Sequence, residues 1–123
     1  MSKLALYIAA ARPKTLPASL GPVLVGFGLA GTQLLIQHWK VALGCILCAL
    51  LLQTSANLVN DYYDAKNAVD VVDRLGPVRA TAGGLLTPEQ VRRAFIFTLS
   101  LSALIGLFLV LSGGLPIAVL GIL

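Results

Sequence analysis

Charged side chains are scarce in this chain, making up 11% of its 123 residues against about 25% in an ordinary soluble domain. Acidic residues are missing from positions 1–60 and 90–123, because all five lie between residues 61 and 89. Cysteine is limited to Cys45 and Cys48, a C-x-x-C spacing inside an apolar stretch without a second pair or a neighbouring histidine. This excludes a disulfide scaffold, and we expect the two cysteines to pack rather than bind a metal.

Apolar residues are abundant instead, at 58% of the chain with a mean hydropathy of +0.91. This composition predicts an all-α integral membrane protein, because a helix needs about 20 apolar residues to span a bilayer. We expect three full spans at about 16–36, 41–64 and 88–111, and the start of a fourth at Leu115. The run from Leu115 to Leu123 is too short to span, so the sequence looks truncated.

The basic residues predict the topology. Three of the nine lie before the first expected span and five lie between residues 66 and 93, up to the first turns of the third, whereas Lys40 alone lies between the first and second. By the positive-inside rule, we expect the N-terminus and the segment 61–93, including the loop 65–87, to be cytoplasmic. The net charge of +4 is thus a topology signal, with attraction to anionic lipid as a second reading, and it gives no indication of nucleic-acid binding.

Two carboxamides and two carboxylates lie where the second expected span ends, in Asn57-Leu-Val-Asn60-Asp61-Tyr-Tyr-Asp64. At about 100° per residue, Asn57, Asp61 and Asp64 fall within roughly 60° of one another on one helix face. Two carboxylates about 6 Å apart repel by roughly 3 kcal/mol at an effective dielectric of about 20, so they require a counter-charge. Oxygen ligands of this kind predict a site for Mg²⁺ that bridges to a phosphate.

The segment 65–87 carries further acidic and basic residues, so one region supplies both metal ligands and phosphate-binding cations. The alternative is a solvated helix end with surface ion pairs, which does not explain the shared face on the span. The next helix is predicted to begin at residue 88, with Thr87 as its N-cap, Pro88 at its first position and Gln90 three residues after the N-cap.

The segment 57–64 resembles the first Asp-rich motif of the UbiA-type membrane prenyltransferases. Residues 12–26 and 73–79 are similar to signatures of the menaquinone-pathway 1,4-dihydroxy-2-naphthoate polyprenyltransferases within that family, and 84–88 fits as well. The resemblance covers most of residues 12–93. It implies that residues 1–123 are the N-terminal part of a single domain, a multi-helix transmembrane bundle in the inner, cytoplasmic membrane.

The resemblance also implies an activity, the transfer of a polyprenyl group from polyprenyl diphosphate to an aromatic acceptor, 1,4-dihydroxy-2-naphthoate. It assigns roles to nine residues: Mg²⁺ binding to Asn57, Asn60, Asp61 and Asp64, with Asp61 and Asp64 catalytic; diphosphate binding to Lys66, Arg74 and Arg79; and a supporting outer role to Asp70 and Asp73. Members of the family carry a second, opposing Asp-rich motif, so the missing C-terminal half is an expected partner.

Alternatives remain open at this point. One alternative is that the chain is a catalytically inactive membrane fragment or subunit. Another is that it is a UbiA-type relative that uses another aromatic acceptor. CDP-alcohol phosphotransferases also carry Asp-rich motifs at helix ends, but their pattern needs a glycine where Ala65 follows Asp64. A small transporter predicts acidic residues deeper in the spans.

Overall fold

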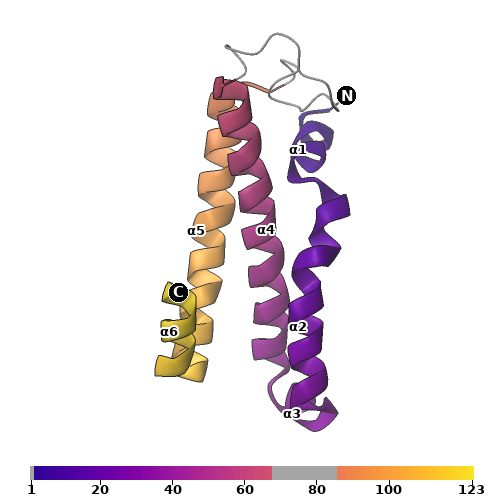
Figure 1. The fold of residues 1–123 in the computed structure, drawn as a ribbon, viewed down its shortest axis with the longest axis vertical. Coiled ribbons are helices and arrows are strands. Elements are labelled where there is room, and N and C mark those ends of the chain that lie inside the picture. The colour runs from indigo at the N-terminus through magenta and orange to yellow at the C-terminus, as the bar shows by residue number, and fades with distance from the viewer. Residues whose placement is uncertain (1, 68–85) are drawn as a thin grey trace.

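A computed structural model describes residues 2–67 and 86–123, apart from the side chains of residues 65–67, and all regular elements within them are helices. This confirms the predicted all-α membrane fold class. In chain order the elements are α1 (Lys3–Ala11), the 3-10 turn η1 (Pro13–Thr15), α2 (Leu16–Ala30), α3 (Thr32–Gln37), α4 (Trp39–Asn67), α5 (Pro88–Gly113) and α6 (Leu115–Ile122) (Figure 1).

The first helix ends where the backbone turns left-handed. Ser2 caps its N-terminus by accepting a hydrogen bond from the backbone N–H of Ala5 at 3.2 Å. At its C-terminus Arg12 has φ 52° and ψ 71°, a conformation that a residue with a side chain rarely adopts. Pro13 follows, and because proline has no backbone N–H it cannot extend α1. The chain therefore bends between α1 and α2.

The segment 16–36, expected as one span, consists of two helices. Gly31 separates α2 from α3 with φ 87°, a conformation that glycine adopts without a steric penalty. The 15 residues of α2 measure about 22 Å along the axis, less than the roughly 30 Å of a hydrocarbon core. A count of apolar residues does not register the break that Gly31 introduces.

Within the described residues, two helices are long and apolar enough to cross a membrane. These are the stretch Trp39–Asp64 of α4 and the whole of α5, each 26 residues and therefore about 39 Å long. They run antiparallel side by side, while α2 and α1 pack along the other side of α4 (Figure 1). Helix α4 therefore lies between α5 on one side and α1 and α2 on the other.

Small and hydroxylated residues line the contact between α4 and α5. A Cβ added to Gly44 would lie 3.1 Å from Cδ2 of Leu109, so the helices approach closely there. About three turns further along α4, the hydroxyls of Ser55 and Thr98 lie 2.7 Å apart. Close approach of small residues and hydrogen bonds between hydroxyls are the interactions that hold helices together where no water is available.

The cysteines contribute to this contact as packing residues. Both are free and half-buried, and the Cys48 thiol donates a hydrogen bond to the carbonyl of Ser102 at 3.7 Å. The thiol thereby supplies one more polar link between the two helices, as expected for a small buried side chain.

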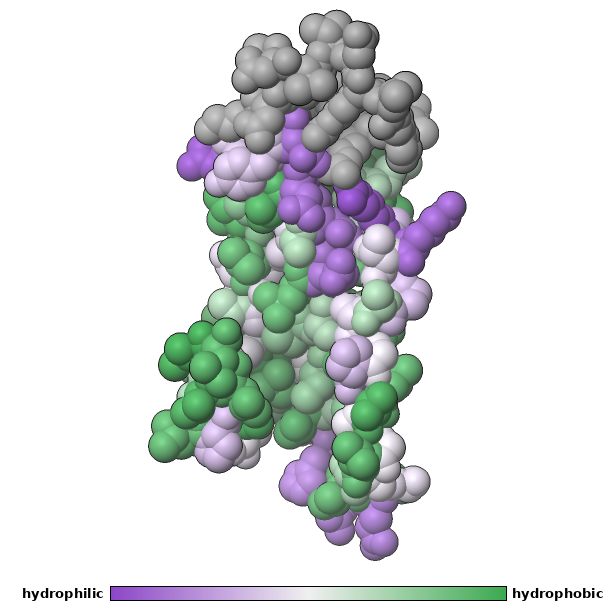
Figure 2. Space-filling model, viewed as in Figure 1, coloured by the Kyte–Doolittle hydropathy of each residue, from purple (hydrophilic) through white to green (hydrophobic). Residues whose placement is uncertain are grey.

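Apolar side chains cover the outside of the helices, and polar residues gather toward the two ends of the molecule (Figure 2). Leu104 and Leu111 of α5 are 66% and 78% exposed. An apolar surface of this extent is suited to lipid or to further helices rather than to water.

The close approach at Gly44 generates a prediction. Replacing Gly44 by Val should push α4 and α5 apart at Leu109 and destabilise the pair by about 1–3 kcal/mol, the usual effect of overpacking. The measurement is unfolding by SDS in mixed micelles, followed by circular dichroism.

The matched control is Gly106→Val in α5, where a Cβ meets nothing within 4 Å. This variant should change stability by less than about 0.5 kcal/mol. Equal losses in the two variants would contradict the close packing at Gly44.

Candidate functional site

Three helix ends meet at one end of the molecule: α1, the last turns of α4 and the first turns of α5 (Figure 1). The buried apolar side chains of the described residues gather here: Leu6, Ala10, Leu58, Leu86 and Val91. The best-packed part of the structure therefore surrounds the predicted Asn/Asp motif, and not the middle of the spans.

Two residues of the predicted face are buried in this packing. Asp61 is 1% exposed and Asn57, one turn earlier, is 4% exposed. Asp64 is half-buried, whereas Asn60 is exposed. The structure therefore brings Asn57 and Asp61 to the inner side of α4, with Asp64 at its margin and Asn60 on the outer side. Asn60 thus does not share the buried surface with the other predicted ligands.

The side chain of Asn57 connects α4 to the bend between α1 and α2. Its Nδ2 donates hydrogen bonds to the carbonyl of Ala11 and to Oγ1 of Thr15, both at 2.7 Å. Its Oδ1 accepts a longer hydrogen bond from Nε2 of Gln53 at 3.4 Å. Thr15 in turn donates to the carbonyl of Arg12 at 2.9 Å. Carbonyls at a helix C-terminus lack partners within the helix, and Asn57 supplies one to α1.

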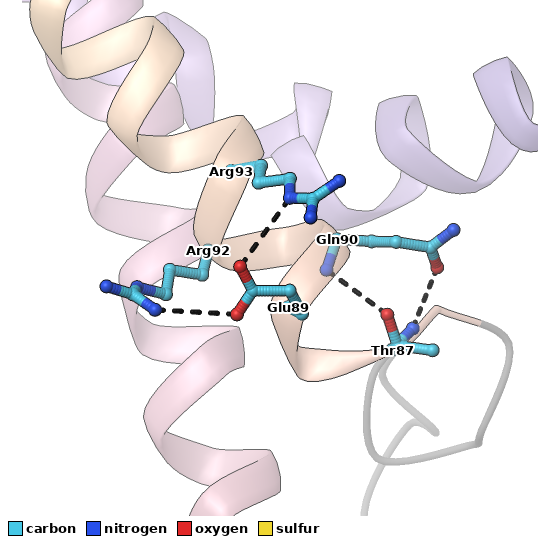
Figure 3. A network of polar contacts seen from close by, with 5 residues as sticks. All are labelled: Thr87, Glu89, Gln90, Arg92 and Arg93. Atoms are coloured by element: carbon cyan, nitrogen blue, oxygen red, sulfur yellow. Dashed lines mark hydrogen bonds and ion pairs between the residues drawn. The ribbon is translucent and has the colours of Figure 1, made fainter.

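The start of α5 is fixed by a capping box, as its sequence predicts (Figure 3). The backbone N–H of Thr87 donates to Oε1 of Gln90 at 2.9 Å, and the N–H of Gln90 donates to Oγ1 of Thr87 at 3.2 Å. Pro88 occupies the first helical position. These contacts satisfy N–H groups that a helix N-terminus leaves free and fix where the chain enters the membrane after residue 86.

Glu89 lies in the first turn of α5 between two arginines. Its carboxylate oxygens are 3.5 Å from Nη1 of Arg92 and 3.5 Å from Nε of Arg93 (Figure 3). All three side chains are more than half exposed, so these ion pairs contribute little to stability. The fifth acidic residue of the chain is thus paired at the surface and is separate from the buried motif.

Several predicted site residues lie outside the described residues. These are Asp70, Asp73, Arg74 and Arg79, together with the side chain of Lys66, whose backbone belongs to α4. Their proposed contacts with diphosphate stay predictions.

The described donor set fits a hard cation in kind. In the parts of the chain that the structure describes, the motif contains two carboxylates, Asp61 and Asp64. No three His, Cys, Asp or Glu side chains come together in those parts. Mg²⁺ is usually held by one or two carboxylates, with phosphate oxygens and water completing the octahedron. A buried carboxylate at the end of an apolar helix agrees with that requirement.

Sequence reasoning missed Thr15 as a partner of the motif. The bend at Arg12 and Pro13 was visible as a break before the first span, but a hydrogen bond across 42 positions leaves no periodic signal. The buried hydroxyl pair of Ser55 and Thr98 was missed for the same reason.

Comparison with known proteins gives a family and named relatives. The profile of the UbiA prenyltransferase family matches residues 19–123. The chain is 40% identical over 112 residues to the 1,4-dihydroxy-2-naphthoate octaprenyltransferase of Escherichia coli, covering 89% of this chain and 35% of that protein. It is 40% identical over 111 residues to the enzyme of the same name from Mycobacterium tuberculosis, covering 90% and 37%.

A human protein, UbiA prenyltransferase domain-containing protein 1, is 33% identical over 99 residues, covering 79% of this chain and 29% of that protein. The chain therefore spans about a third of the length of the curated relatives that it matches. No solved structure gives a significant match.

Proposed function

This chain belongs to the UbiA prenyltransferase family, and from that premise we propose that it supplies the first metal- and diphosphate-binding motif of a prenyltransferase. The donor substrate is a polyprenyl diphosphate and the acceptor is 1,4-dihydroxy-2-naphthoate, the acceptor in the names of the two bacterial relatives. Their names also indicate an octaprenyl chain. Because the chain spans about a third of these relatives, the activity belongs to a site that other residues complete.

The observation that carries the proposal is the burial of Asp61, at 1% exposure, at the end of an otherwise apolar membrane helix. An ionisable side chain there is costly to bury and is functional by default. Asp64 lies one turn away at the margin of the same packing. These two positions support the proposal that the pair would bind a cation together with the phosphate of the donor.

Asp61 and Asp64 would hold Mg²⁺, with the amide oxygen of Asn57 as a further expected ligand. Asn60 is an expected ligand by resemblance alone, because it lies on the outer side of α4. A divalent cation held by these residues would supply positive charge to offset that of the departing diphosphate. Arg74 and Arg79 bind the diphosphate oxygens, since a guanidinium offers two parallel donors to a phosphate, and Lys66 adds a third cation. By resemblance Asp70 and Asp73 would extend the motif.

In the proposed reaction the allylic C–O bond of the donor breaks, and its electron pair leaves with diphosphate. The electron-rich ring of the acceptor then forms a carbon–carbon bond to the allylic cation, and its carboxylate leaves as CO₂, so that the charges balance. The apolar walls of α4 and α5 exclude water, which would otherwise capture the cation.

The same proposal includes an orientation in the membrane. The ends of α1, α4 and α5 that meet around Asp61 carry most of the basic residues, whereas Lys40 lies at the other end, with its Nζ 5.8 Å from the ring centre of Trp39. We therefore place the N-terminus and the motif on the cytoplasmic side of the inner membrane.

The metal assignment predicts the effect of neutralising the carboxylates. Asp61→Asn or Asp64→Asn should lower Mg²⁺-dependent prenyl transfer by about a hundredfold or more, because each removes a charged ligand. The measurement is transfer of a labelled polyprenyl group to 1,4-dihydroxy-2-naphthoate in isolated membranes, with immunoblotting to show that insertion is unchanged.

The control is Glu89→Gln, which removes an exposed carboxylate that pairs only with α5 arginines among the described contacts. It should leave transfer unchanged. Retained activity in both Asp variants would rule out the metal role.

The diphosphate assignment predicts a change confined to the donor. Arg79→Ala should raise the KM for polyprenyl diphosphate by about tenfold and leave the KM for the acceptor within about twofold, because the guanidinium contacts phosphate oxygens. Steady-state kinetics with each substrate varied in turn give both constants.

Arg92→Ala is the matched control, because Arg92 is an exposed arginine on α5 that pairs with Glu89. Both KM values should stay unchanged in this variant. Equal increases for donor and acceptor in Arg79→Ala would count against a diphosphate contact.

A further inference from the structure

The two shortest hydrogen bonds of Asn57 are made by its amide nitrogen, an atom that does not bind metal ions. A cation binds an amide through its oxygen, whereas this nitrogen donates to Ala11 and Thr15 at 2.7 Å. The side chain is 4% exposed, so these partners satisfy a group that would otherwise be buried without hydrogen bonds.

The bend that Asn57 contacts is held in an uncommon conformation. Arg12 has φ 52°, and a non-glycine residue with this backbone requires support from its surroundings. Three hydrogen bonds provide it: Arg12 N–H to the carbonyl of Ala9 at 3.2 Å, Thr15 N–H to the carbonyl of Arg12 at 3.0 Å, and Thr15 Oγ1 to the same carbonyl at 2.9 Å. Asn57 contacts two residues of this bend from α4, at Ala11 and Thr15.

The bend also carries two cations, Arg12 and Lys14, on either side of Pro13. The contact with Asn57 fixes their backbone one turn of α4 away from Asp61. Both substrates of the proposed reaction are anions, one a diphosphate and the other an aromatic carboxylate. Cations held at this end therefore contribute to the field that attracts them.

We infer that Asn57 is a positioning residue, which holds the α1–α2 bend and its two cations against the polar end of α4 through its amide nitrogen. The substrate-binding part of this inference rests on the proposed function. The hydrogen-bonded connection itself does not, because it is a property of the protein without substrates.

Asn57→Asp separates this role from metal binding. The carboxylate keeps an oxygen for a cation but has no N–H to donate to Ala11, so the bend loses its connection while a metal ligand is retained. Thr15→Val removes the other acceptor without altering any predicted metal ligand. Thr15→Ser keeps the hydroxyl and should behave as the unsubstituted protein.

The first readout is amide hydrogen exchange of peptides covering residues 9–16 in the full protein without substrates. Asn57→Asp and Thr15→Val should each speed exchange there by about tenfold, because a buried hydrogen bond is lost, and exchange in the middle of α5 should be unchanged. Gln53→Ala, which removes only the 3.4 Å hydrogen bond to Oδ1, should have the smallest effect.

The second readout is kinetic. In Asn57→Asp and Thr15→Val the KM of at least one anionic substrate should rise by about tenfold. In Thr15→Val, which alters no predicted metal ligand, the Mg²⁺ concentration for half-maximal activity should stay within about twofold. The inference would be overturned if amide exchange at residues 9–16 stayed unchanged in either Thr15→Val or Asn57→Asp. If the unsubstituted protein shows no prenyl transfer, the proposed function fails, and the exchange measurement still decides whether Asn57 holds the bend.

Discussion

A carboxylate or an amide surrounded by apolar side chains requires partners, because burying it alone costs several kcal/mol. This constraint governs the polar end of the molecule. Asn57 meets it with hydrogen bonds to the bend between α1 and α2. Asp61 is buried one turn further along α4, and we propose that it also binds the metal. The arrangement of α1 beside α4 therefore depends on the same helix turn that carries the site, and fold and chemistry share residues there.

The rest of the chain follows a different principle. Along α4 and α5 the contact is made by close approach at Gly44 and by hydroxyls at Ser55 and Thr98, while large apolar side chains face outward. Such a pair provides an apolar wall without using polar groups for chemistry. Under the proposed function, the polar end would hold the anionic head of the donor and the apolar helices would lie along its chain.

The sequence alone predicted those features that rest on composition and local patterns. Helices α4 and α5, the capping box at Thr87 and the membrane class follow from apolar length and from N-cap chemistry. The division of the first apolar segment at Gly31 was not predicted, because hydropathy does not register a change in φ. The hydrogen bonds of Asn57 to Ala11 and Thr15 were not predicted. Helix periodicity shows which side chains share a face, but not which residues 42 or 46 positions away they contact.

The most direct test of the account replaces Mg²⁺ by Mn²⁺ and records pulsed electron paramagnetic resonance of the full protein with a non-cleavable polyprenyl diphosphate analogue. The account predicts hyperfine coupling between Mn²⁺ and the phosphorus of the analogue, which is lost when Asp61 is replaced by Asn. Mn²⁺ that shows only water ligands, or a phosphorus coupling that persists unchanged in Asp61→Asn, would contradict the claim that this buried carboxylate holds the metal.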